Sequence, residues 1–168
     1  MKIRPATLAD IPAMKEIFEI GRQKQIATGN PNQWLPGYPS TEQLTADINS
    51  GTSYVCLNDS EEMVGTFYLL LGEDPAYQVI EEGQWLNDLP YVTIHRIVSK
   101  YDKQGIGQQC IQWVMIQYPN IKIDTHELNQ PMRQLLTKLG FQYCGIIYLP
   151  DGRTRVAYQY YQEDRMTK

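Results

Sequence analysis

One stretch of the chain, from Tyr91 to Gln117, limits the possible folds more than any other. It begins with the β-branched run Tyr91–Val98, which predicts a central strand because branched side chains pack well on a pleated surface. Gly105-Ile106-Gly107 follows, and apolar residues then recur with the period of an α-helix. A strand that continues through a glycine-containing loop into a helix predicts a sheet with a helix packed against it.

Further strands and helices are expected on both sides of this stretch. The other strands are predicted at residues 3–5, 53–57, 63–71, 121–125, 141–149 and 153–161. The other helices are predicted to begin at two capping boxes and one cap, namely Thr7/Asp10, Ser40/Gln43 and Asn129. Irregular segments are expected at residues 28–39 and 73–90. This order mixes parallel crossovers with antiparallel hairpins, so the predicted fold is α+β, with a mixed sheet flanked by helices.

Length and composition restrict the class of protein. A chain of 168 residues has the usual length of one domain, so residues 1–168 are predicted to form a single domain. With 42% hydrophobic and 20% charged residues, disordered, collagen-like and coiled-coil proteins are excluded. The net charge of -4 and the absence of Lys/Arg runs exclude the electrostatic pattern of a nucleic-acid-binding protein. The mild acidity is compatible with a cationic small substrate.

Cysteine content and the length of the apolar stretches indicate the cellular compartment of the protein. Cys56, Cys110 and Cys144 are an odd number at wide spacing, which fits neither a zinc site nor a disulfide framework and favours a reducing compartment. The opening MKIRPATLAD lacks the apolar region of a signal peptide. The most apolar stretch, Val64–Leu71, is far shorter than the ~20 residues of a membrane helix. We expect a soluble cytoplasmic protein with no metal and no membrane partner.

The loop between the central strand and its helix has features of an anion-binding site. Glycines let a ligand approach the backbone closely, and a helix N-terminus carries about half a positive charge. Lys100 and Lys103 add formal charge beside it. The alternative is a glycine pair that only makes a turn. A Walker loop is excluded because no Lys-Ser or Lys-Thr follows a second glycine, and a dinucleotide fingerprint fails because Cys110 replaces its third glycine.

Motifs along most of the chain resemble those of one known family. In chain order they are Ile3-Arg4-Pro5-Ala6-Thr7 with Asp10, Ile94-His95-Arg96-Ile97-Val98, Gly105-Ile106-Gly107, Asp124-Thr125-His126-Glu127-Leu128-Asn129 and Lys138-Leu139-Gly140-Phe141. With the C-terminal hairpin that follows them, they resemble the GNAT superfamily of N-acetyltransferases over about residues 2 to 161. The resemblance implies one domain with a partly splayed sheet, acetyl-CoA as donor and a primary amine as acceptor.

The resemblance also implies roles for particular residues. Acetyl-CoA is expected in the splay between the fourth and fifth strands, with its acetyl carbonyl held by the backbone of Ile97 and Val98. The pyrophosphate is expected on the backbone amides of Lys103, Gln104, Gly105, Ile106, Gly107 and Gln108. Asn129 is expected to contact the pantetheine as well as to cap a helix.

Two positions depart from the family pattern. Asp102 stands three residues before the first glycine, where the family usually has Gln or Arg. Leu136 stands where many members have a tyrosine that protonates the leaving thiolate. A positioned general acid is worth about 10²–10⁴-fold in rate. A thiol with a pKa near 8.5 leaves readily as its anion. The absence of the tyrosine is therefore expected to slow the reaction rather than prevent it.

A few single residues are candidates for chemistry or substrate binding, each with a structural alternative. His95 could relay a proton from the incoming ammonium, or it could be a hydrogen-bonded strand residue. His126 could face the substrate or organise the turn around it. Trp34, Tyr38 and Trp85 could line an acceptor pocket or anchor loops. Cys144 is interpreted as a packed strand cysteine rather than a nucleophile.

The predicted function is N-acetyl transfer by direct attack of an uncharged amine on acetyl-CoA. The acceptor is a small-molecule or peptide amine, and the sequence leaves a homodimer open. Two alternatives remain: a non-catalytic acyl-CoA-binding or sensor module, which Leu136 favours, and an interaction domain whose glycine loop only makes a turn.

Overall fold

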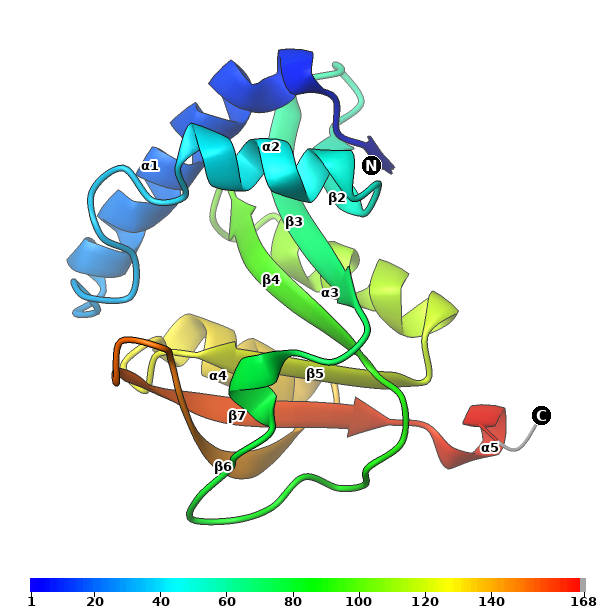
Figure 1. The fold of residues 1–168 in the computed structure, drawn as a ribbon. Helices are drawn as coiled ribbons and strands as arrows, with labels where there is room; N and C mark the ends of the chain where they lie inside the picture. The colour runs from blue at the N-terminus through cyan, green and yellow to red at the C-terminus, as the bar shows by residue number, and fades with distance from the viewer. Residues whose placement is uncertain (167–168) are drawn as a thin grey trace. The chain divides into compact units, whose positions relative to one another are not determined.

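A computed structural model describes residues 1–166, and its α+β fold confirms the predicted class (Figure 1). The elements are β1 (Lys2–Pro5), η1 (Leu8–Asp10), α1 (Ile11–Ala27), α2 (Thr41–Asn49), β2 (Ser53–Leu57), β3 (Met63–Leu71), η2 (Pro75–Tyr77), β4 (Val92–Ser99), α3 (Ile106–Gln117), β5 (Asn120–Thr125), α4 (Gln130–Lys138), β6 (Gln142–Tyr148), β7 (Thr154–Tyr161) and α5 (Glu163–Met166). The strands form a mixed sheet in the order β1-β2-β3-β4-β5-β7-β6.

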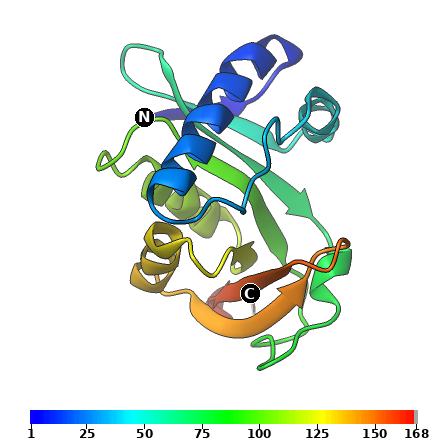
Figure 2. The ribbon, with the colours of Figure 1, turned by 90° about the vertical axis from the view of Figure 1, so that its left-hand side faces the viewer.

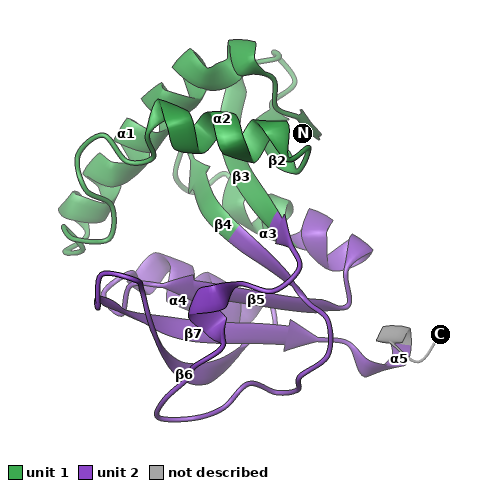
Figure 3. Ribbon diagram, viewed as in Figure 1, with its two compact units in different colours: residues 1–69, 95–111 green, residues 70–94, 112–168 purple. Residues whose placement is uncertain are grey.

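The chain divides into two compact units, which are described separately (Figure 3). Unit 1 comprises residues 1–69 and 95–111, and therefore contains α1, α2, the later part of β4 and the start of α3. Unit 2 comprises residues 70–94 and the chain from residue 112 onward, including α4 and strands β5 to β7.

The core of unit 1 depends on one face of α1, which crosses the strands of this unit in Figure 2. Met14, Ile17, Phe18 and Gly21 recur at helical spacing on that face and are buried. At Gly21 a Cβ atom would lie only 2.4 Å from Cγ2 of Val98, so no larger residue fits there without displacing its neighbours. The absence of a side chain at this position brings α1 into close contact with the end of β4.

The two predicted capping boxes have different outcomes. The first forms as predicted: the carboxylate of Asp10 accepts a hydrogen bond from the backbone N–H of Thr7 (2.7 Å). The same carboxylate forms an ion pair with Arg4 (2.8 Å). In the second, Ser40 caps α2 by accepting the backbone N–H of Gln43 (3.1 Å), as predicted. The side chain of Gln43 does not complete this box; its amide nitrogen donates to Asp47 Oδ1 (2.9 Å).

In unit 2 the segment predicted to be irregular, residues 73–90, is held by buried contacts and contains the short helix η2. The ring of Tyr77 is buried and lies 5.1 Å from that of Trp85. The hydroxyl of Tyr77 donates to Asp124 on β5 (2.6 Å). The backbone of Glu81 pairs with Ile146 on β6. The segment is therefore tied to two strands of its own unit.

A buried lysine lies beneath this segment. Lys122 on β5 is only 4% exposed, and its ammonium lies 3.9 Å from the ring centre of Tyr91 and 4.2 Å from that of Trp85. Burial lowers the pKa of Lys122 to about 8, although nearby acidic groups, among them Glu73 and Asp88, partly oppose the shift. The two ring faces also attract the cation. Desolvation is the largest influence on the pKa of Lys122.

Replacing this lysine should therefore change how stability depends on pH. Below pH 8 the side chain is protonated in both folded and unfolded chains, so burial of the charge destabilises the fold. Between about pH 8 and 10.5 the folded protein loses the proton first, and the penalty disappears. We expect Lys122→Met to raise the melting temperature at pH 7, with a gain that shrinks across that range.

Thermal denaturation of parent and variant from pH 6 to 10.5 measures this difference. Lys2→Met, at an exposed position of β1, is the control and should show no such pH-dependent gain. A gain for Lys122→Met that stays constant up to pH 10.5 would contradict the assignment.

Candidate functional site

The loop between β4 and α3 lies wholly within unit 1 and is exposed. Residues 101–105 are all exposed, whereas Ile106, the first residue of α3, is buried. Lys103 (φ +62°) and Gly105 (φ +69°) both have left-handed backbone conformations. The first N–H groups of a helix have no acceptor within the helix, and left-handed residues in loops arrange successive amides into anion-binding concavities. This geometry is the kind that an anion-binding loop requires.

Three elements of unit 1 hold this loop in place. The backbone N–H of Lys100 donates to the carbonyl of Val64 on β3 (2.8 Å). The ammonium of Lys24 on α1 donates to the carbonyl of Ser99 (3.1 Å) and pairs with Asp102 (3.0 Å). The residue that departs from the family pattern at position 102 therefore anchors the loop to α1.

A glycine of β3 makes room for the start of α3. A Cβ atom at Gly65 would lie 3.0 Å from Cγ2 of Ile106 and 3.2 Å from the carbonyl oxygen of Val98. The N-terminus of the helix can therefore lie close to the strand.

The two lysines at the loop differ in whether another side chain already pairs with them. Lys100 pairs with Glu62 (2.9 Å), which also accepts the hydroxyl of Tyr101 (2.6 Å). These contacts, with Tyr101 first, lower the pKa of Glu62, and Glu62 raises that of Lys100. Lys103 is exposed and makes no hydrogen bond or ion pair with any other residue in the described range 1–166. Of the two predicted loop lysines, Lys103 is thus the one whose charge is available to a ligand.

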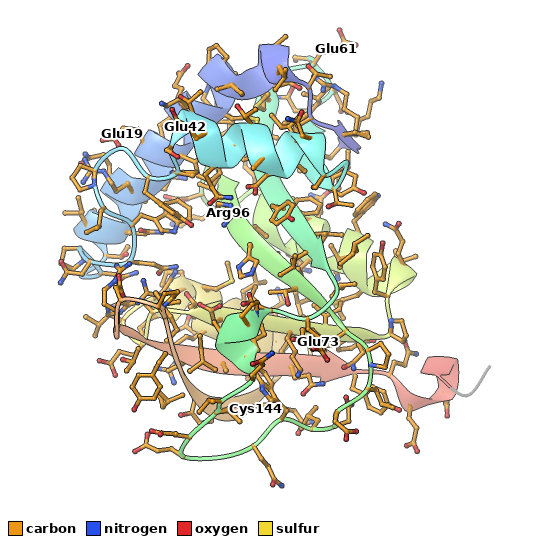
Figure 4. All side chains as sticks on the ribbon, in the orientation of Figure 1. Glu19, Glu42, Glu61, Glu73, Arg96 and Cys144 are labelled. Atoms are coloured by element: carbon orange, nitrogen blue, oxygen red, sulfur yellow. The ribbon has the colours of Figure 1, made fainter. Side chains whose placement is uncertain are left out.

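Sequence reasoning missed an ion pair beside the later part of β4. Nε of Arg96 donates to Asp47 Oδ2 (2.7 Å) and Nη2 donates to Oδ1 (2.8 Å). In Figure 4 the Arg96 side chain extends from β4 toward α2, which carries Asp47. A signal existed, because Asp47 lies three residues after the buried Leu44, on the face that α2 turns to the core. A carboxylate at such a position requires a partner.

The unit 1 candidates differ in exposure. His95 and Ile97 are half-buried on either side of Arg96, and Val98 is buried in the core cluster. Trp34 is also buried in this cluster, and its ring meets that of Phe18 edge-on with the ring centres 5.5 Å apart. This contact corresponds to the loop-anchoring alternative for Trp34. Tyr38 is 39% exposed, with its hydroxyl 3.5 Å from Nη1 of Arg96.

The aromatic and histidine candidates of unit 2 make local structural contacts. Trp85 donates its indole N–H to the carbonyl of Tyr77 (2.9 Å), which anchors the 73–90 segment. Nδ1 of His126 accepts the backbone N–H of Leu128 (3.1 Å), so His126 organises its turn. Burial and then the charge of Arg155 lower the pKa of His126.

Two residues that the family resemblance singled out, Asn129 and Leu136, lie at the N-cap of α4 and within it. Asn129 accepts the backbone N–H of Met132 (3.2 Å) and caps the helix, as predicted. Leu136 is fully buried and has no proton to donate.

The cysteines are all buried. Burial raises the pKa of Cys144, which Figure 4 shows beside β6, and its thiol lies 3.4 Å from the carbonyl of Gln142. The sulfur atoms of Cys56 and Cys110 lie 3.1 Å apart. Within residues 1–166 no group of three or more His, Cys, Asp or Glu side chains could hold a metal, and no helix is long and apolar enough to cross a membrane.

Comparison with known proteins identifies the family. No protein-family model and no curated protein matches the sequence. Among solved structures, a GNAT-family acetyltransferase from Streptococcus agalactiae is 33% identical, with a TM-score of 0.87 over 96% of this chain and 95% of that one. A putative acetyltransferase from Staphylococcus aureus is 19% identical, with a TM-score of 0.68 over 96% and 99% of the two chains.

A third similar structure has its donor bound. It is a GNAT-superfamily phosphinothricin acetyltransferase from Sinorhizobium meliloti in complex with AcCoA, 16% identical, with a TM-score of 0.62 over 94% of this chain and 86% of that one. At this identity the similarity concerns the fold. The streptococcal enzyme is similar in sequence as well as in fold, at 33% identity over 96% of this chain. With the strand–loop–helix motif, this similarity shows that the chain belongs to the GNAT family of acetyltransferases.

Proposed function

We propose that this protein transfers the acetyl group of acetyl-CoA to a primary amine. The observation that carries the proposal is the exposed loop 101–105, which leads into the N-terminus of α3 and is held by β3 and α1. It occurs in a member of the GNAT family, and a protein of similar fold binds AcCoA.

The loop suits the pyrophosphate of acetyl-CoA in shape and charge. Backbone amides of residues 103–108 would donate to the phosphate oxygens, and Gly105 and Gly107 leave the backbone open to close approach. The available ammonium of Lys103 adds attraction for the anion. The backbone of Ile97 and Val98, on the same unit, would hold the acetyl carbonyl.

The reaction then needs no covalent enzyme intermediate. The uncharged amine attacks the thioester carbonyl, a C–N bond forms, the C–S bond breaks, and CoA leaves as the thiolate. A thiol with a pKa near 8.5 is a tolerable leaving group, so a buried leucine at position 136 is compatible with turnover. The buried cysteines support a direct transfer. The hydrogen bond with Cys56, and then burial, raise the pKa of Cys110, and burial raises that of Cys144, so reactive thiolates are disfavoured.

A screen for acetyl transfer tests the function. The purified protein, incubated with acetyl-CoA and a panel of small-molecule and peptide amines, should release free CoA thiol only when an accepted amine is present. Mass spectrometry should find the acetylated amine. Acetyl-CoA binding without turnover on any amine would instead support the sensor alternative, and an absence of binding by calorimetry would contradict both.

A substitution in the loop tests where the donor binds. Gly107→Val places a branched side chain where the pyrophosphate would approach, so we expect acetyl-CoA affinity to fall at least tenfold while the fold survives. Gln112→Val, at an exposed position further along α3, puts the same side chain into the same helix and should bind normally. Isothermal calorimetry measures both. Equal affinity of the parent and Gly107→Val would remove the loop from the binding site.

The pH dependence tests how the ammonium proton leaves. Histidine is the side chain that changes charge between about pH 5 and 8, and we propose His95 as the relay. The rate should rise from about pH 6 to 8, with no steep fall at a tyrosine-like pKa of ~10. His95→Ala should flatten or shift the rising limb and lower the rate about tenfold to a thousandfold. An unchanged profile and rate would mean that solvent removes the proton.

A further inference from the structure

Arg96 has an unusual backbone conformation for a residue inside a strand. Its φ is +50°, whereas β4 extends on both sides of it, from Val92 to Ser99. Residues other than glycine rarely adopt this conformation, because the Cβ atom crowds the backbone. Such a conformation persists only where the surrounding structure holds it.

The guanidinium of Arg96 is held by three elements of unit 1. Asp47, only 3% exposed on α2, accepts two hydrogen bonds from it (2.7 and 2.8 Å). The ring of Tyr68 on β3 lies 4.9 Å from the guanidinium carbon. The hydroxyl of Tyr38, in the loop before α2, lies 3.5 Å from Nη1. The carboxylate is itself fixed by Gln43, whose side-chain amide donates to it (2.9 Å).

The strand beyond Arg96 is held by other contacts. Val98 packs in the core against α1, the carbonyl of Ser99 accepts the ammonium of Lys24, and the N–H of Lys100 donates to Val64. None of these contacts involves the guanidinium. Loss of the ion pair should therefore alter residues 95–97 while leaving the loop at 101–105 in place.

We propose that Asp47 and Arg96 are positioning residues for acetyl transfer. Their ion pair holds the left-handed conformation of Arg96 and so sets the direction of the backbone at Ile97, where the acetyl carbonyl is proposed to bind. This inference rests on the proposed function. The charge of Arg96 is already balanced by Asp47, so its role lies in holding the backbone and not in attracting a substrate.

Variants at the two positions separate this role from simple stabilisation. Arg96→Ala removes the guanidinium and leaves a side chain that disfavours a φ of +50°. Arg96→Gly also removes the guanidinium, but glycine adopts this φ readily. Asp47→Ala, alone and combined with Arg96→Gly, completes a double-mutant cycle. Glu19→Gln, which weakens the exposed Glu19–Arg22 pair on α1, is the control and should behave as the parent.

The measurements are kcat and KM for both substrates and calorimetric affinity for CoA, at a temperature where every variant is folded. Arg96→Ala and Asp47→Ala should lower kcat about tenfold to a hundredfold, the size expected when reacting groups are misplaced by about 1 Å. Arg96→Gly should recover at least about fivefold of that loss, and CoA affinity should stay within about threefold of the parent. Asp47→Ala should have little effect once residue 96 is glycine.

Other outcomes would overturn the inference in distinguishable ways. Unchanged kcat in all folded variants would make the ion pair purely structural. Equal losses in Arg96→Gly and Arg96→Ala, with a raised KM for the amine, would mean that the guanidinium binds the acceptor directly. If Arg96→Ala does not fold, the parent, Arg96→Gly, Asp47→Ala and the double variant are compared. Positioning requires that Asp47→Ala lower kcat with arginine at position 96 but not with glycine there, and an equal loss in both backgrounds would contradict it. A parent without turnover would overturn the proposed function itself.

Discussion

The architecture of unit 1 depends on the close contact between α1 and the end of β4. Gly21 permits it, because a Cβ atom there would lie 2.4 Å from Val98. The same approach brings Lys24, one helical turn further along, to the carbonyl of Ser99 and to Asp102 (3.1 and 3.0 Å). One tight apolar contact thereby fixes both the last residues of the strand and the first part of the candidate pyrophosphate loop.

Several charged groups of unit 1 form ion pairs, whereas the exposed Lys103 of the loop forms none with the described residues. Asp47 pairs with Arg96, Glu62 with Lys100, and Asp102 with Lys24. Pairing offsets the cost of desolvation, which an isolated buried charge would bear in full. Lys103 is exposed at a left-handed position in the loop, three residues before α3 begins at Ile106. An anionic ligand would therefore meet an available cation and a helix N-terminus together.

Sequence reasoning predicted the local features well, because they depend on neighbouring residues. The strand at 53–57 and the caps at Ser40 and Asn129 all occur as expected. It failed where a side chain meets a partner from another element. Asp47 pairs with Arg96, which comes from a strand far along the chain, and Gln43, predicted to close a capping box, donates to the same carboxylate. The pattern of residues 40–47 does not identify which cation approaches Asp47.

The sequence by itself determined the fold class and the position of the glycine loop, since periodicity, caps and turn residues act over a few positions. Its motifs also resembled those of the GNAT family, to which the chain belongs. Only the tertiary structure decided which of Lys100 and Lys103 keeps an available charge, that Trp34 packs in the core, and that Arg96 adopts a left-handed conformation beside a buried carboxylate. Each of these depends on contacts between residues tens of positions apart. Packing and desolvation energies arise only when such residues meet, and no local spacing encodes them.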